Sequence, residues 1–100
     1  MRNTPLYDHY VRMCRMRAFE EACIAGAAQR KIHGELHTGI GQEAVASGLA
    51  VHLRRADALV STHRNHLHGL AKGVDEAALM AEIFEKETGI CRGRGGHMHP

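Results

Sequence analysis

The stretch "PLYDHYVRMCRMRAFEEACIAGAAQR", Pro5 to Arg30, decides the fold class, because its apolar residues recur at helical spacing. They follow one another at steps of three and four residues: Leu6, Tyr10, Met13, Met16, Phe19 and Cys23. This period places them on one face of a helix, and Pro5 suits a first turn, where its missing N–H is no loss. The pattern predicts a helix over residues 6–30, and its charged residues, Glu20 among them, are expected on a solvated face.

Three shorter helices are predicted downstream of this one, over residues 42–54, 65–72 and 76–87. Val45, Leu49 and Leu53 form an apolar stripe on the first of them. Asp75 is a candidate N-cap, and Gly89 is the predicted end of the last helix. The segment "ALVS", residues 58–61, is either a buried strand or simply an extended segment. A lone strand makes no sheet, so the chain is predicted to be mostly α and to need the surface of a larger domain.

The bulk properties exclude several classes of protein. The chain has 100 residues, 44% hydrophobic and 24% charged, which is a globular balance in the size range of one small domain. A net charge of +2 is too weak a bias to favour nucleic acid, and no apolar run is long enough for a membrane span. The polar N-terminus and the absence of a CxxC pair favour free thiols in the cytoplasm. The three cysteines are Cys14, Cys23 and Cys91.

The stretch "STHRNHLHG", Ser61 to Gly69, concentrates three histidines and an arginine, which suit metal, nucleic acid or phosphate. Metal is disfavoured because the paired Cys and His of structural zinc sites are missing. Nucleic acid is disfavoured because the one arginine–glycine segment, "CRGRGGHMHP", has no interleaved aromatics. Phosphate is supported by His63 and Arg64, which stand between an extended segment and a helix start. From these residues alone, an exposed polar loop is slightly preferred to a phosphate site.

Three longer motifs decide between these alternatives. The stretches "LHTGIGQEAVASGLAVHL", "VSTHRNHLHGLAKGVD" and "LMAEIFEKETGICRGRGGHMH" follow one another at the spacing found in one family. The chain resembles, from about residue 6 to residue 99, the N-terminal part of the alpha subunit of thiamine diphosphate-dependent 2-oxo acid dehydrogenases. Members of that family act on pyruvate, branched-chain 2-oxo acids or acetoin. The resemblance implies that residues 1–100 are the incomplete N-terminal part of an α/β thiamine diphosphate-binding domain.

The resemblance also implies roles for individual residues. His63 and Arg64 match residues that contact the diphosphate of the cofactor, and His37 and His66 match active-site histidines. A loop beside the active-site entrance is matched by four residues: Arg94, Gly95, Gly96 and His99. No metal ligand is assigned, because the family's magnesium-binding segment lies downstream of the matched motifs. Two positions depart from the family pattern, Glu35 where an apolar residue is usual and His97 where a small one is.

The partners that the resemblance implies are the beta subunit, the remainder of the alpha subunit and the acyltransferase component of a multienzyme complex. Neither nucleic acid nor a membrane is expected as a partner. The chain alone is expected to be inactive. The alternative function is a stand-alone helical interaction module or a degenerate, non-catalytic fragment, and a reading frame encoding the rest of the domain next to this one would argue against it.

Overall fold

The structure, a computed structural model, describes residues 5–100. Its four helices are α1 (Pro5–Ala28), α2 (Glu43–Ala50), α3 (His66–Ala71) and α4 (Glu76–Ile83). No strand occurs within residues 5–100, which confirms the prediction of a mostly α chain. The segment 58–61 is irregular, and Val60 is 97% exposed. The buried-strand alternative is therefore wrong.

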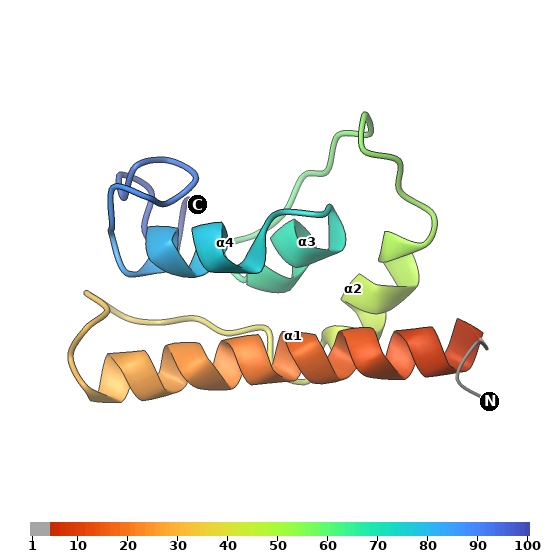
Figure 1. The fold of residues 1–100 in the computed structure, drawn as a ribbon, viewed down its shortest axis with the longest axis horizontal. Coiled ribbons are helices and arrows are strands. Elements are labelled where there is room, and N and C mark those ends of the chain that lie inside the picture. The colour runs from red at the N-terminus through yellow and green to blue at the C-terminus, as the bar shows by residue number, and fades with distance from the viewer. Residues whose placement is uncertain (1–4) are drawn as a thin grey trace.

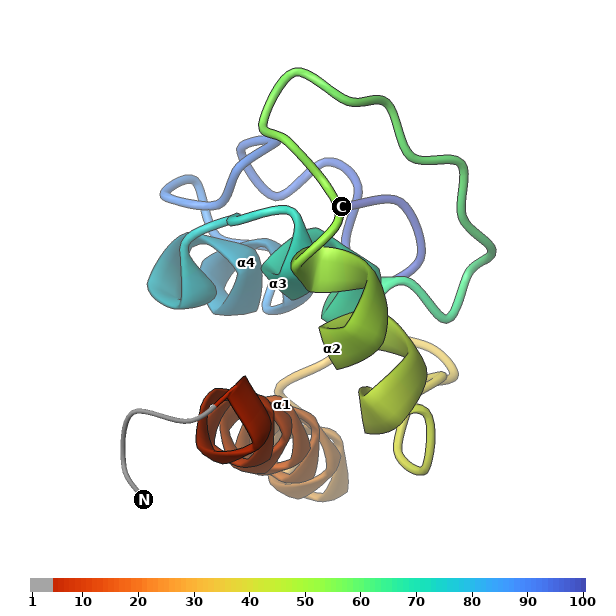
Figure 2. The same ribbon diagram turned by 90° about the vertical axis from the view of Figure 1, so that its right-hand side faces the viewer.

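Helix α1 forms one side of the molecule, and α2, α3 and α4 lie along its other side (Figure 1). The segment 29–42 turns back at the end of α1 and runs beside it (Figure 1). A view along α1 from its N-terminal end shows the segment 51–65 arching away from the helices (Figure 2). The long first helix is thus the surface on which the later elements are assembled. No helix in the described part of the chain is long and apolar enough to cross a bilayer.

Two apolar clusters hold α1 against the other helices. The first joins α1 to α4 and contains Phe19, Cys23, Ile32, Leu79 and Ile83. The second joins α1 to α2 and α3 and contains Met16, Ala46 and Leu67. Each fully buried large side chain contributes about 1.5–3 kcal/mol of hydrophobic stabilisation. The predicted apolar face of α1 is confirmed in its middle, whereas Leu6 and Tyr10 in its first turns are 81% and 66% exposed.

Helix α2 turns a different face inward from the one that its apolar stripe predicts. Val45 and Leu49 are 61% and 41% exposed, while Glu43, Ala46 and Ser47 are buried. Ser47 lies against α1, where its Oγ accepts a hydrogen bond from Arg12 at 3.1 Å. The prediction fails because small and polar contacts orient α2 on α1, and this leaves the apolar stripe facing outward.

Loop 51–64 begins where α2 ends, four residues earlier than predicted. The helix ends because the N–H groups of His52 and Leu53 bond back three residues instead of four. The loop is then held by Lys72, whose ammonium donates to three backbone carbonyl groups: those of Arg54, Arg55 and Asp57. The ammonium group of Lys72 therefore holds the first half of this loop in place.

The ends of α3 and α4 share one hydrogen-bonded motif but use different residues. After α3, Gly73 has φ +90° and closes the helix, as glycine commonly does. After α4, Glu85 takes the same left-handed conformation with φ +58°, and the N–H of Lys86 donates to the carbonyl of Ala81 at 2.8 Å. The predicted end at Gly89 is wrong because a non-glycine residue adopts the glycine-favoured conformation. The predicted N-cap is confirmed, since Asp75 accepts the N–H of Ala78 at 3.0 Å.

Candidate functional site

The structure brings two of the predicted site histidines into direct contact. His37 lies in the segment 29–42, and His63 lies at the end of loop 51–64. Their rings meet edge to face, with centroids 4.7 Å apart at an interplanar angle of 85°. The side chain of His37 is 27% exposed, whereas His63 is exposed. Residues 26 positions apart therefore form one small, solvent-accessible imidazole pair.

Arg64 fastens the same two segments to each other. Its Nη1 donates to the carbonyl of Thr38 at 2.6 Å, and its own N–H donates to the Oγ1 of Thr62 at 3.3 Å. A guanidinium carries five N–H donors in a rigid fork, and one of them is used here. Arg64 is exposed, so the remaining donors are accessible to an anion. The donor set of Arg64, His37 and His63 suits a phosphate or diphosphate group.

His66 occupies a different environment from the other predicted site residues, because it is fully buried. Its Nε2 donates to the carbonyl of His97 at 2.8 Å, and its Nδ1 lies 2.7 Å from Oε1 of Glu20. The other carboxylate oxygen of Glu20 accepts the N–H of Gly39 at 2.6 Å. The buried pair thus ties α1, segment 29–42, α3 and the tail together. This geometry gives His66 a positioning role, and a catalytic role for it stays a prediction.

Glu20 was expected on a solvated face, and its burial is a correction. Within the described residues, Glu20, Cys23 and His66 are the one group that brings three metal-ligand atoms within 4.8 Å of one another. Burial, reinforced by the neighbouring charge of Glu20, raises the pKa of the Cys23 thiol to about 12. A thiol with so high a pKa stays protonated and is a poor ligand. Glu20 and His66 are hydrogen-bonded to each other, and this hydrogen bond explains why their side chains lie close together.

The predicted active-site loop makes no direct contact with the histidine pair through Arg94 or His99, although Asn65, next to Arg64, donates to the carbonyl of Met98 at 3.2 Å. Arg94 and His99 are exposed, and neither has a hydrogen bond or ring contact to His37 or His63 in the described part of the chain. The backbone N–H groups of the loop turn inward to Glu82, a residue that sequence reasoning missed. The missed signal is the glycine spacing that follows α4.

The two positions that depart from the family pattern have different environments. Glu35 is exposed, and its carboxylate lies 3.9 Å from Nε2 of His37. His97 is buried, and its Nε2 donates to the carbonyl of His33 at 3.0 Å. Its Nδ1 has no hydrogen-bond partner among residues 5–100, and burial lowers its pKa. The bulky residue at 97 therefore packs inward and ties the tail to segment 29–42.

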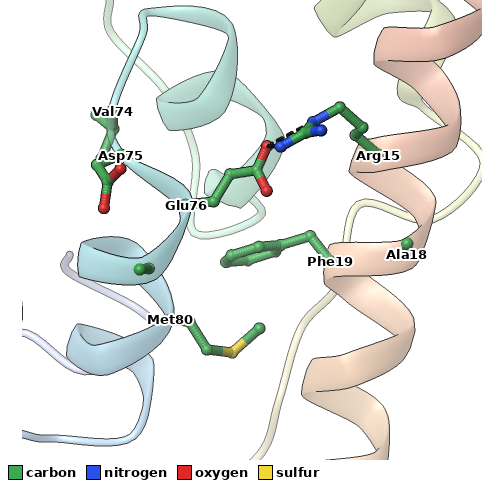
Figure 3. Close-up of a pocket in the computed structure, with 8 residues that line it drawn as sticks. Arg15, Ala18, Phe19, Val74, Asp75, Glu76 and Met80 are labelled. Atoms are coloured by element: carbon green, nitrogen blue, oxygen red, sulfur yellow. Dashed lines mark hydrogen bonds and ion pairs between the residues drawn. The ribbon is translucent and has the colours of Figure 1, made fainter.

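An open groove of about 830 Å³ runs between α1 and α4, away from these residues. Figure 3 shows Phe19 and Met80 between the two helices, and Arg15 paired with Glu76 across the groove at 2.7 Å. None of the predicted site residues lines it. Its walls combine part of the apolar contact between α1 and α4 with three charged side chains, those of Arg15, Asp75 and Glu76.

Comparison with known proteins matches the sequence of this chain to one family. The family described as "Dehydrogenase E1 component" matches residues 11–100. The chain is 47% identical over 90 residues to the alpha subunit of the acetoin:2,6-dichlorophenolindophenol oxidoreductase of Bacillus subtilis, covering 90% of this chain and 27% of that protein. It is 48% identical over 83 residues to a chloroplastic pyruvate dehydrogenase E1 component subunit alpha-3 of Oryza sativa, covering 83% of this chain and 20% of that one. The pyruvate dehydrogenase E1 component subunit alpha of Zymomonas mobilis is 42% identical over 95 residues, with shares of 94% and 27%. The chain thus spans about a quarter of the length of the curated relatives it matches.

Proposed function

The chain belongs to the dehydrogenase E1 component family, and from that premise we propose that it supplies diphosphate and substrate contacts to the alpha subunit of a thiamine diphosphate-dependent dehydrogenase. The substrate class is a 2-oxo acid or acetoin. The observation that carries the proposal is the contact between His37 and His63, together with the accessible guanidinium of Arg64 beside them.

The residues of this site suit the proposed cofactor by their chemistry. When bound, thiamine diphosphate supplies the electron sink for cleaving a bond next to a carbonyl group. Arg64 and His63 hold the diphosphate, since a guanidinium binds phosphate oxygens in a planar, two-point manner. His37, which is partly exposed beside them, holds or moves a proton near neutral pH, a task suited to imidazole. Magnesium bound by residues outside this sequence completes the proposed cofactor site.

The proposed partners follow from the family. A beta subunit, the remaining segments of an alpha subunit and an acyltransferase component complete the proposed enzyme, and the chain alone is inactive. The competing function is an interaction module. It is favoured by the outward apolar stripe of α2, where Val45 and Leu49 are exposed. The two functions are distinguished by whether single side chains at the histidine pair control cofactor binding.

The test is cofactor binding by the enzyme assembled with those remaining segments and a beta subunit. Arg64→Ala should weaken thiamine diphosphate binding by about 1.5–3 kcal/mol, the range for a hydrogen bond to a charged group. Isothermal titration calorimetry with magnesium present measures this, and Arg55→Ala, an exposed arginine of the same loop, is the matched control. Equal affinities for Arg64→Ala and Arg55→Ala would refute the assignment.

His37→Ala separates the two proposed roles in the same assembled enzyme. Its turnover should fall more than its cofactor affinity, because general acid–base help is worth about 100- to 10,000-fold. Steady-state kinetics with pyruvate and with acetoin provides the comparison. A variant with normal turnover at saturating thiamine diphosphate but weakened affinity for it would show that His37 contacts the diphosphate rather than the substrate.

A further inference from the structure

The glycine-rich loop 89–97 closes around one side chain, the fully buried carboxylate of Glu82. Its Oε1 accepts the backbone N–H groups of Cys91 at 2.6 Å and Gly93 at 2.9 Å. Its Oε2 accepts those of Gly95 at 2.8 Å and Gly96 at 3.1 Å. Successive N–H groups that point into one concavity make an anion-binding site. Here the chain fills that site with its own carboxylate.

The glycine spacing of this loop follows from how tightly it wraps Glu82. A Cβ at Gly89 would lie 2.5 Å from the Cα of Glu82 and 2.6 Å from its Oε1. A Cβ at Gly93, where φ is +80°, would lie 2.6 Å from the carbonyl group of Glu85. Both approaches are shorter than real Cβ contacts allow. Gly89 and Gly93 are therefore explained by contact with α4 and its end, rather than by a flexible segment that binds nucleic acid.

We propose that Glu82 is a positioning residue: its carboxylate is the resident anion on which loop 89–97 folds, and it thereby sets the places of Arg94 and His97. The position of His97 in turn affects residues outside the loop. Its carbonyl group accepts a hydrogen bond from Nε2 of buried His66, and the Nε2 of His97 donates to the carbonyl of His33. Any consequence for catalysis rests on the proposed function. The folding of the loop around Glu82 does not.

The charge of Glu82 is what the loop recognises. Burial alone would raise the pKa of this carboxyl group, but the four backbone N–H donors outweigh burial and lower it. The carboxylate form, with two acceptor oxygens, therefore persists at neutral pH. A glutamine of the same shape offers one acceptor oxygen, and its amide N–H₂ would face two of the loop's own donors. A neutral side chain that merely fills space cannot replace the anion.

Amide hydrogen exchange, followed residue by residue by NMR on the 100-residue chain, tests this proposal without any cofactor. In Glu82→Gln, exchange at Cys91, Gly93, Gly95 and Gly96 should become at least tenfold faster, while the middle of α1 keeps its protection. Glu87→Gln, an exposed glutamate two residues before the loop, should change none of these rates. Glu82→Ala adds a chemical rescue: acetate should restore protection of the loop, and acetamide, its neutral isostere, should not.

The outcomes separate a resident anion from a space-filling side chain. Rates in Glu82→Gln within twofold of the parent would overturn the proposal, and so would equal rescue of Glu82→Ala by acetate and acetamide. If Glu82→Ala does not fold, the glutamine variant decides alone. The exchange readout involves neither thiamine diphosphate nor a partner subunit. A failure of the proposed function would therefore appear in calorimetry at Arg64 and leave this result unchanged.

Discussion

Loops 51–64 and 89–97 are each held by one charged side chain, but the two charges have opposite signs and different burial. The difference separates a loop whose hydrogen bonds are satisfied inside the molecule from a loop that presents side chains to solvent. Loop 89–97 directs four N–H donors onto one anion, Glu82, which is fully buried. Loop 51–64 directs three carbonyl groups onto one cation, Lys72, which is partly exposed. Loop 51–64 also presents Val60, 97% exposed, and the proposed cofactor ligands His63 and Arg64. The loop with the buried anchor is self-contained, and the one with the exposed anchor carries the residues available for binding.

The largest effect is expected from removing the buried anchor. Glu82→Ala leaves four inward N–H groups without an acceptor, so the free energy of unfolding should fall by about 3 kcal/mol. Urea unfolding followed by circular dichroism measures it, with Glu87→Ala as the control. A loss under about 0.5 kcal/mol, the range of ordinary surface substitutions, would remove the contrast between the two loops.

An intermediate effect on stability is expected at the half-buried ion pair of Arg17 and Glu43, and this effect depends on pH. The pKa of Glu43 is lowered to about 2, chiefly by hydrogen bonds from Arg17 at 2.8 and 3.1 Å, with a further contribution from the N–H of Gly41. The folded pKa lies below the ordinary value of 4.5, so the pair stabilises the fold above that pH, and the contribution is lost as the pH falls toward 2. Because the side chain of Arg17 is 45% exposed, Arg17→Met should cost only about 1–2 kcal/mol at neutral pH.

The pH dependence of this cost is the sharper measurement. Urea unfolding of the parent and of Arg17→Met between pH 7 and about pH 3 should show the difference narrowing below about pH 4.5. Arg15→Met, which breaks the more exposed pair with Glu76, is the matched control and should cost less at pH 7. A difference for Arg17→Met that stays constant across this range would show that packing rather than charge is lost.

A smaller effect is expected at the exposed anchor. Lys72→Met frees three carbonyl groups that can turn to water, so the free energy of unfolding should fall by about 1 kcal/mol. The local consequence is larger than the global one, because cleavage after Arg54 or Arg55 by an arginine-specific protease should become faster. Lys86→Met, at an exposed lysine, is the control. Unchanged cleavage would mean that another contact holds loop 51–64.

The smallest effect is expected at the tip of the same loop. Val60→Ser replaces a side chain that contacts almost nothing, so stability should change by no more than about 0.5 kcal/mol. The substitution removes an exposed apolar side chain, so self-association should not increase. Sedimentation-velocity ultracentrifugation over a range of concentrations measures it. A substantial loss of stability would show that Val60 is buried in solution.

The sequence predicted where the helices lie better than it predicted which of their side chains are buried. Apolar spacing located α1 within two residues at each end, and Asp75 was identified as a cap from its type and position alone. Glu20 and Glu82 were not predicted as buried, because a carboxylate on a helix looks solvated until its acceptors meet donors from distant loops. The end of α4 was missed for a related reason, since Glu85 takes a conformation that sequence rules assign to glycine.

The candidate site was predicted in part. His63 and Arg64 were located between an extended segment and a helix start, and α3 does begin at His66. The contact of His63 with His37 could not be read from spacing, because it depends on how segment 29–42 returns along α1. The same return path delivers Gly39 to Glu20. Such contacts are set by tertiary packing, and local patterns contain no record of them.

The buried thiol of Cys23 can report how fast α1 and α4 separate. Its thiol is fully buried between α1 and α4, and its pKa of about 12 leaves almost no thiolate, the form that reacts with alkylating reagents. Cys14 and Cys91 are exposed. A thiol reagent should therefore modify the folded chain in two stages, with the third label entering only when the helices part. Counting labels by mass against time would give the rate of that separation in the unmodified sequence, with no probe added.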